Sequence, residues 1–341
     1  MDKLRFISWV LYATISTLAF GEITPYKFIE SDESLPQYDI PNDSQFTIKE
    51  AGENAADITY YFSKPKADGY PIAILCGGSS DKNNPSSIIH FHRYFLQELL
   101  DLGVAVLTVE QQGVRGNNID NQEFTDHYTL SKRLHDHQMV IELIKASPPK
   151  NWNGEIIFMG VSEGGPIVTA LTSEYTDITI ATINWSGAGD WPWREELWAF
   201  IENLKMANPE CPHGVKLKEC NFCSEHMMNR RDYDAHMDSM LRNPSVSEDF
   251  LNMTYKYHAD ASHFRLPNYE RIRTPFLVVT GGLDTLIETS DAFVRKAEYA
   301  GCPVTYMRIA DMDHYVRKRV DIIQESFDWL KREIQQQKAI N

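Results

Sequence analysis

The chain has 341 residues and a formal net charge of −15 at pH 7, with 33 Lys and Arg against 48 Asp and Glu. This acidic balance argues against a nucleic-acid partner, because phosphate backbones attract basic surfaces. Hydrophobic residues make up 43% and charged residues 24% of the chain, which excludes a disordered chain and suits one core domain with an insertion.

The N-terminus has the pattern of a secretory signal. A short charged start precedes an uncharged, mostly apolar stretch at residues 7–20, and Ala19-Phe20-Gly21 forms a small-x-small cleavage pattern. An anchor helix of about 14 residues reaches only about 21 Å, less than a hydrocarbon core of about 30 Å. We therefore expect residues 1–21 to be a signal peptide and the mature protein to be secreted or periplasmic, with no stable membrane span.

The first third of the chain predicts the start of a sheet. Residues 45–50 and 57–63 have the pattern of two strands joined by a turn, and residues 71–75 are continuously apolar, as in a strand buried on both faces. This third strand runs into Cys76-Gly77-Gly78-Ser79-Ser80. The glycines there allow a close approach of the backbone to a ligand.

A helix-strand-helix series follows. Residues 88–102 have helical spacing, residues 104–109 predict a buried strand, and residues 128–146 predict a long amphipathic helix. On that last helix His135 and His137 are two residues apart and so lie on different faces. We interpret both as surface histidines and not as a pair of metal ligands.

The strongest motif is Gly160-Val161-Ser162-Glu163-Gly164, which follows an apolar run at 155–159 and precedes a helical segment at 165–171. A strand that feeds a helix through Gly-x-Ser-x-Gly is a nucleophile elbow, with a serine hydroxyl exposed on a strained turn. The two glycines are required because the strand and the helix approach so closely that side chains at Gly160 and Gly164 would collide.

With this motif the sequence resembles the α/β-hydrolase superfamily, in its serine esterase and prolyl-peptidase-like branch, over roughly residues 44–337. Two later segments fit the superfamily's order of Ser, then Asp or Glu, then His. An apolar run at 274–280 leads to Asp284, and another at 304–309 leads to His314. The resemblance implies an α/β-hydrolase fold: a mostly parallel sheet flanked by helices, with an inserted helical cap.

The resemblance also implies roles for single residues. Ser162 is the expected nucleophile, His314 the base and Asp284 the acid, with Asp190 as the alternative acid. The expected oxyanion hole is made by the backbone N–H groups of Gly78 and Glu163. We interpret Asp311 and Asp313, which flank the histidine, as groups that cap the loop.

The superfamily inserts its cap where this chain loses its buried strands. We expect residues 22–186 and 274–341 to form the two parts of the core and residues 187–273 to form the cap. Trp191, Trp193 and Trp198 lie at its entrance, where the indoles either line an apolar substrate pocket or pack the cap onto the core.

Charged residues near these segments offer further substrate contacts. Arg115 lies in the loop after the 104–109 strand, where it either holds a substrate carboxylate or bonds neighbouring acids. Glu195 and Glu196 follow the tryptophans. In relatives that remove N-terminal residues from peptides, acidic cap residues bind the substrate's ammonium group.

The predicted cap carries a cluster of Cys211, His213, Cys220, Cys223 and His226. In an exported chain a disulfide among the three cysteines is the simpler interpretation, while the Cys-x-x-Cys spacing also suits a structural zinc site, and free thiols are the third alternative. The remaining two cysteines, Cys76 and Cys302, adjoin strands and are interpreted as core residues.

The sequence thus predicts a serine hydrolase that cleaves an ester, thioester or amide of a small-molecule or peptide substrate, with no cofactor and no catalytic metal. A carboxylesterase is the first choice. A serine peptidase or aminopeptidase, an acyltransferase with the same triad and a non-catalytic binding protein on this fold are the alternatives. The sequence leaves the oligomeric state open.

Overall fold

A computed structural model describes residues 45–49, 56–80, 82–83, 85–116, 118–187, 189–207 and 228–340. Within them, eight strands form one sheet in the order β1-β2-β4-β3-β7-β8-β11-β12. These are β1 (Gln45–Ile48), β2 (Ile58–Ser63), β3 (Tyr70–Cys76), β4 (Ala105–Val109), β7 (Trp152–Val161), β8 (Thr179–Trp185), β11 (Phe276–Gly281) and β12 (Val304–Ile309). The β1–β2 and β2–β4 pairs are antiparallel, and the strands from β4 to β12 pair in parallel.

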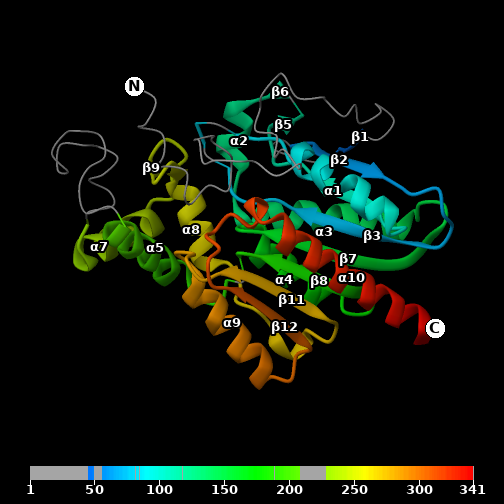
Figure 1. The fold of residues 1–341 in the computed structure, drawn as a ribbon. Helices are drawn as coiled ribbons and strands as arrows, with labels where there is room; N and C mark the ends of the chain where they lie inside the picture. The colour runs from blue at the N-terminus through cyan, green and yellow to red at the C-terminus, as the bar shows by residue number, and fades with distance from the viewer. Residues whose placement is uncertain are drawn as a thin grey trace.

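Helices cover both faces of this sheet, as Figure 1 shows. The flanking helices are α1 (Ile89–Asp101), α3 (Leu130–Ala146), α4 (Gly164–Glu174), α9 (Ile287–Tyr299) and α10 (Val320–Ile340). Successive side chains of a strand point to opposite faces. In β3, accordingly, Ile72 and Ile74 pack toward α3 and α4, whereas Ala73 and Leu75 pack toward α1 and α10. This architecture confirms the predicted fold class.

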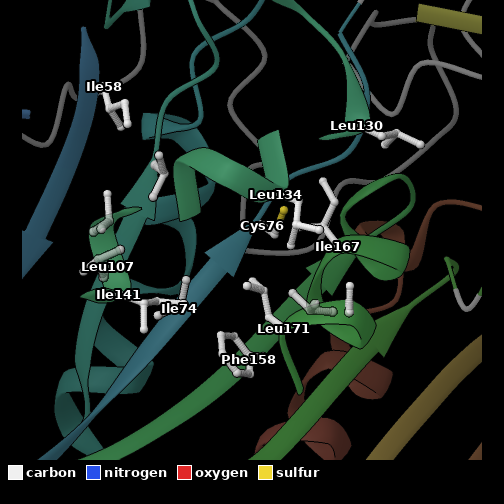
Figure 2. Packing of buried hydrophobic residues seen from close by; sticks show 14 of the residues in the cluster. Ile58, Ile74, Cys76, Leu107, Leu130, Leu134, Ile141, Phe158, Ile167 and Leu171 are labelled. Atoms are coloured by element: carbon white, nitrogen blue, oxygen red, sulfur yellow. The ribbon is translucent and has the colours of Figure 1, made fainter. Parts of the chain in front are cut away.

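The core on the α3 and α4 face is a continuous apolar layer. Figure 2 shows Ile74 and Phe158 of the sheet beneath Ile141 of α3 and Leu171 of α4. All four side chains are fully buried. Burying a side chain of this size stabilises the fold by about 1.5–3 kcal/mol. These contacts hold α4 against β3 and β7 of the sheet.

The helical cap follows β8. It contains α5 (Trp193–Ala207), α7 (Arg230–Arg242), a two-strand hairpin of β9 (Asp249–Phe250) and β10 (Met253–Thr254), and α8 (Tyr255–His263). Its helices have an apolar core of their own that includes Leu197, Tyr233 and Met237. A turn of 3-10 helix, η3 (Tyr269–Arg271), then leads back to the sheet at β11. A second, η4 (Val316–Lys318), precedes α10.

Two small features were not predicted from the sequence. The loop after β4 contains a short hairpin of β5 (Val114–Arg115) and β6 (Asn118–Ile119) and a helix α2 (Asn121–His127). The following α3 begins at Leu130, where the Thr129 side chain accepts a hydrogen bond from the Lys132 N–H. An N-cap threonine starts a new helix in this way.

The interpretation of His137 as a surface residue is wrong. His137 is only 3% exposed, whereas His135 is exposed. The reason is helical spacing, because His137 lies one turn beyond Leu134 and one turn before Ile141 on the buried face of α3. Burial lowers the pKa of His137 to about 4, so its imidazole is neutral at pH 7.

The loops that follow β3, β7, β11 and β12 meet at one edge of the sheet, because these strands are parallel. They carry Gly78, Ser162, Asp284 and His314. Ligands bind at this edge in open α/β sheets. Among the helices of the described ranges, none is both long enough and apolar enough to cross a membrane.

Candidate active site

Ser162 lies on a strained turn directly after β7. Its φ of 52° is in the left-handed region, which a residue with a side chain rarely adopts. The turn is held by two backbone hydrogen bonds: the Ser162 N–H donates to Trp185 O over 2.9 Å, and Ser162 O accepts from the Gly165 N–H over 2.8 Å. The conformation is therefore fixed by β8 and by the first turn of α4.

Close packing around this turn explains its glycines. A Cβ atom on Gly164 would lie 2.1 Å from Cys76 O, and one on Gly160 would lie 2.6 Å from Gly164 O. Real Cβ atoms do not approach so closely, and backbone atoms cannot move aside as a flexible side chain can. The predicted collision at Gly160 and Gly164 is confirmed.

Two further polar side chains meet the Ser162 hydroxyl. His314 Nε2 lies 3.0 Å from Ser162 Oγ, and His314 Nδ1 lies 2.9 Å from Asp284 Oδ2. All three side chains are buried. The Leu286 N–H donates to the other Asp284 oxygen over 2.9 Å. The imidazole thus bridges a hydroxyl and an oriented carboxylate, an arrangement that can take a proton from the hydroxyl.

The surroundings of His314 favour its charged form. Burial lowers its pKa, but the negative charge of Asp284 and the hydrogen bond to that carboxylate raise it, and the net pKa lies above 6.5. An imidazole in this setting is a stronger base than a free one.

The other acidic residues near the site have different partners. Asp190 accepts a hydrogen bond from Tyr269 and pairs with Lys296 Nζ at 2.6 Å. Asp313 accepts from the Tyr315 N–H over 2.8 Å within the same loop, and the exposed Asp311 pairs with Arg319. Asp284 is the carboxylate that the structure brings to His314.

Gly78 and Glu163 have free backbone donors. Within the described residues, neither of their N–H groups makes a hydrogen bond. On the neighbouring Gly77, the carbonyl oxygen accepts a hydrogen bond of 2.6 Å from Arg133 Nη2. A trans peptide holds its C=O and the following N–H on opposite sides, so this bond turns the Gly78 N–H away from Arg133.

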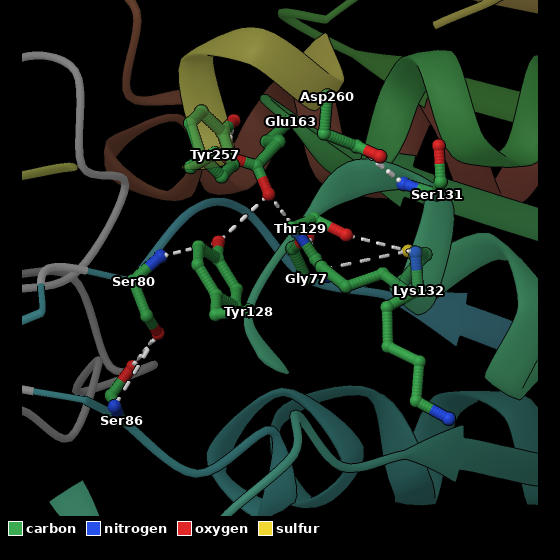
Figure 3. A network of polar contacts seen from close by, with 12 residues as sticks. Gly77, Ser80, Ser86, Tyr128, Thr129, Ser131, Lys132, Glu163, Tyr257 and Asp260 are labelled. Atoms are coloured by element: carbon green, nitrogen blue, oxygen red, sulfur yellow. Dashed lines mark hydrogen bonds and ion pairs between the residues drawn. The ribbon is translucent and has the colours of Figure 1, made fainter. Parts of the chain in front are cut away.

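A buried polar cluster surrounds the side chain of Glu163, the residue after Ser162. The Glu163 carboxylate accepts hydrogen bonds from Tyr128 Oη over 2.7 Å, from Tyr257 Oη over 2.5 Å and from Arg133 Nη1. Figure 3 shows Tyr128 and Tyr257 pointing at this carboxylate from two different segments. Burial and the charge of Glu163 both raise the pKa values of the two phenols, so both stay protonated and donate.

This cluster joins three parts of the fold through one carboxylate. Arg133 comes from α3, Tyr257 comes from the cap helix α8, and Glu163 directly follows Ser162. Arg133 is only 5% exposed, and a buried charge is tolerated when it is paired and hydrogen-bonded. Arg133 also donates to Gly77 O, so one guanidinium holds both the Glu163 side chain and the backbone of the loop after β3.

A family model described as serine aminopeptidase, S33, matches residues 87–315 of the chain. The chain belongs to this family. Its fold and its family together make the protein a hydrolase of the α/β-hydrolase type. No curated protein matches the sequence.

Solved structures of several hydrolases resemble this S33 family member. Est1E from Butyrivibrio proteoclasticus is 16% identical over 85% of this chain and 99% of its own, with a TM-score of 0.52. A carboxylesterase structure from Nitrososphaera gargenis is 13% identical over 85% and 100%, with a TM-score of 0.52. The acylaminoacyl peptidase of Pyrococcus horikoshii is 13% identical over 85% of this chain but only 41% of its own, with a TM-score of 0.52. At such identities the likeness shows the fold.

Two cavities open beside the turn that carries Ser162 in this S33 protein. The cap-side cavity is lined by residues that include Ser162, Glu163, Trp191, Trp193, Glu196 and Tyr257. The α1-side cavity is lined by residues that include Gly77, Gly78, Phe91, Tyr94, Gln111 and His314. Ser162 belongs to the wall of the first cavity and His314 to the wall of the second.

The structure places the remaining predicted contacts as follows. Trp191 and Trp193 reach the cap-side cavity, and the Trp193 Nε1–H donates to His258 Nδ1 over 3.2 Å. Trp198 instead packs against Tyr233 inside the cap. Arg115 is bonded to the Glu123 carboxylate at 3.0 Å and does not line either of the two cavities.

The cysteine predictions divide by region. Cys76 and Cys302 are buried free thiols, which confirms them as core residues, and burial raises the pKa of Cys76 to about 11. The cluster of Cys211, Cys220 and Cys223 with its two histidines lies outside the described residues, as do residues 1–21. Within the part of the chain that the structure describes, no group of His, Cys, Asp or Glu is arranged to hold a metal ion.

Arg133, Tyr128, Tyr257 and Gln111 are site residues that the sequence did not reveal. Arg133 lies on α3 and Tyr257 on α8, whereas Tyr128 precedes α3 and Gln111 follows β4. All four reach the site through tertiary packing, which no local motif records. The sequence held one signal for the cluster: Glu163, directly after Ser162, is the N-cap of a buried helix, so its carboxylate needs a cationic or hydrogen-bonding partner.

The Arg133–Glu163 pair is open to a double-mutant test. Arg133→Met should lower the free energy of unfolding by about 3–5 kcal/mol, because it leaves the Glu163 carboxylate buried without its counter-charge. Urea denaturation measures the loss. Arg133→Met combined with Glu163→Gln should be more stable than Arg133→Met alone, since the neutral amide needs no counter-charge. A double variant as unstable as the sum of the two single variants would contradict the pairing.

Proposed function

We propose that this S33 family member is a serine hydrolase that forms an acyl-enzyme on Ser162, with a carboxylic ester as its first substrate class. The observation that carries the proposal is the line of hydrogen bonds from Ser162 Oγ through the His314 imidazole to Asp284, with lengths of 3.0 and 2.9 Å. A serine hydroxyl is a poor nucleophile at neutral pH unless a base accepts its proton.

The proposed reaction has two steps. His314 Nε2 takes the proton of Ser162 as the hydroxyl oxygen attacks the carbonyl carbon, and it gives that proton to the leaving group when the acyl-enzyme forms. Asp284 holds the imidazole in the required tautomer and stabilises its cation. Water then attacks the acyl-enzyme with His314 again as the base, which releases the acid and restores the hydroxyl.

Two backbone donors support the developing negative charge. Glu163 directly follows Ser162 and Gly78 lies in the loop after β3, and the N–H groups of both residues are free of other partners among the described residues. Donors of this kind contribute about 2.7–4 kcal/mol each to stabilisation of the transition state. Arg133 is a positioning residue in this proposal, because it holds the Gly77 carbonyl and thereby the direction of the Gly78 N–H.

Replacing the nucleophile tests the proposal directly. Ser162→Ala should abolish labelling by a fluorophosphonate probe and lower ester hydrolysis on the order of 10⁶-fold, as in other serine hydrolases without their nucleophile. Ser173→Ala is the control, since Ser173 is on α4, where its hydroxyl bonds Ala170 O, and it should keep both activities. Labelling of the Ser162→Ala protein would remove Ser162 from this role.

The pH dependence should report His314. Because the base must be neutral, kcat/KM should rise with pH through an apparent pKa above 6.5, the direction in which Asp284 moves it. Asp284→Asn removes the charge and leaves the burial that lowers the pKa, so the rate should fall by several powers of ten and the apparent pKa should decrease. A pH–rate profile that moves with Asp190→Asn instead would assign the acid to Asp190.

An aminopeptidase is the second candidate, and the observation that favours it is Glu196. Its carboxyl lines the cap-side cavity together with Ser162. Burial raises its pKa to about 7, while a hydrogen bond with Thr289 lowers it and the charge of Asp284 raises it further. A substrate ammonium in this cavity would favour the ionised carboxylate.

Glu196→Gln distinguishes the two candidates. If the enzyme is an aminopeptidase, this change should lower kcat/KM for an alanine anilide about 10–100-fold, the loss expected for a charge-assisted contact of about 1.5–3 kcal/mol. Hydrolysis of an acetate ester, which has no ammonium, should stay within about twofold. Equal losses on both substrates would remove Glu196 from ammonium recognition.

A further inference from the structure

The α1-side cavity is an apolar chamber with an aromatic wall. Phe91 and Tyr94 of α1 line it together with Val161, Val316 and Ile323. Phe91 packs edge-on against Phe95 with ring centroids 5.0 Å apart, which fixes its orientation. Rigid aromatic walls favour a flat apolar occupant, because rings pack edge to face or offset with one another.

The position of this cavity indicates which part of the substrate it binds. His314 and Gly78 line it, and Ser162 does not; the cap-side cavity has Ser162 in its wall and not His314. In the proposed reaction His314 must reach the atom that leaves with the proton. The leaving group therefore lies on the imidazole side, which is the α1-side cavity, and the acyl group lies toward the cap. This step rests on the proposed function.

Gln111 is one of several polar residues in the cavity wall, which also includes Ser86, Ser87, His90 and Arg317. The residue follows β4, lines the cavity and is only 6% exposed. Its Oε1 atom is buried and has no hydrogen-bond partner among the described residues. A buried polar atom without a partner is unfavourable and uncommon in a folded protein. In a cavity wall, such an acceptor is satisfied when a ligand brings a donor.

We propose that the α1-side cavity binds the leaving group and that this group is an aromatic alcohol with a second hydroxyl, which hydrogen-bonds to Gln111. During acylation the bond between Ser162 Oγ and the carbonyl carbon forms and the bond from that carbon to the aryl oxygen breaks. The aryl oxygen takes the proton from His314 Nε2, and the free dihydroxy aromatic product leaves the cavity before water hydrolyses the acyl-enzyme.

Three acetate esters test the assignment, because they form the same acetyl-enzyme and differ only in the leaving group. They are methyl acetate, phenyl acetate and 3-hydroxyphenyl acetate. Gln111→Leu should lower kcat/KM for 3-hydroxyphenyl acetate by about 5–10-fold, the effect of one hydrogen bond, with the other two esters within about twofold. Phe91→Ala should lower kcat/KM for both aryl esters about tenfold relative to methyl acetate.

The matched control is Gln97→Leu. Gln97 lies on the exposed side of α1, where its amide donates to Asp101 Oδ1 over 2.7 Å, so this variant should leave all three kcat/KM values unchanged. Hydrolysis of the acetyl-enzyme, followed after the burst of product, should be the same in all variants. An equal loss of kcat/KM on all three esters in Gln111→Leu would overturn the proposal. A loss of kcat/KM in these variants that changes with acyl length, when phenyl acetate is compared with phenyl butyrate, would also overturn it.

Binding of the product separates this inference from the proposed function. Resorcinol, the product of the hydroxyphenyl ester, should bind to the Ser162→Ala protein, and Gln111→Leu in that background should weaken its affinity about 5–10-fold in an NMR titration. No chemistry is needed for this measurement. Unchanged resorcinol binding in Gln111→Leu would sink the cavity assignment, whereas hydrolysis by Ser162→Ala would sink the nucleophile assignment and leave the binding result standing.

Discussion

The site depends on backbone-to-backbone contact at the turn that carries Ser162. A Cβ atom on Gly164 would lie 2.1 Å from Cys76 O, and one on Gly187 would lie 1.9 Å from Ser162 O. Only glycine at these positions lets β3, β7, β8 and α4 converge so closely. That convergence holds a serine at a φ of 52°, and it brings the end of β3 against the first residue of α4. Every other feature of the site is arranged around this fixed point.

A second layer of the site is electrostatic. Arg133 is a buried cation that bonds both the Glu163 carboxylate and the Gly77 carbonyl, and two tyrosines complete the coordination of the carboxylate. Removing the two charges of such an ion pair from water is unfavourable. Their mutual attraction offsets this cost only when every lone pair and every donor proton has a hydrogen-bond partner. The arrangement therefore contributes precision more than stability, because it aligns the two loops that follow the neighbouring strands β3 and β7.

The sequence predicted the parts of this design that have local patterns. The strands appear in the sequence as apolar runs, and Ser162, Asp284 and His314 lie in the loops that follow three of these runs. Their meeting at one edge of a parallel sheet therefore follows from topology. His137 was misplaced because its polarity was weighed above its helical spacing from Leu134. Arg133 and Gln111 could not be found at all, since their roles arise from how α3 and the loop after β4 pack against distant segments, which no local pattern records.

The hydrogen bond from Tyr257 to Glu163 has a consequence for motion. Tyr257 belongs to the cap helix α8, and its hydroxyl donates a hydrogen bond of 2.5 Å to the carboxylate of Glu163, the residue after Ser162. A displacement of α8 that breaks this bond leaves the carboxylate with one donor fewer in a water-poor interior. Cap position and turn geometry are thus thermodynamically linked, and the linkage is reciprocal. A ligand that prefers one placement of the cap therefore shifts the turn by the same coupling free energy with which a change at the turn shifts the cap.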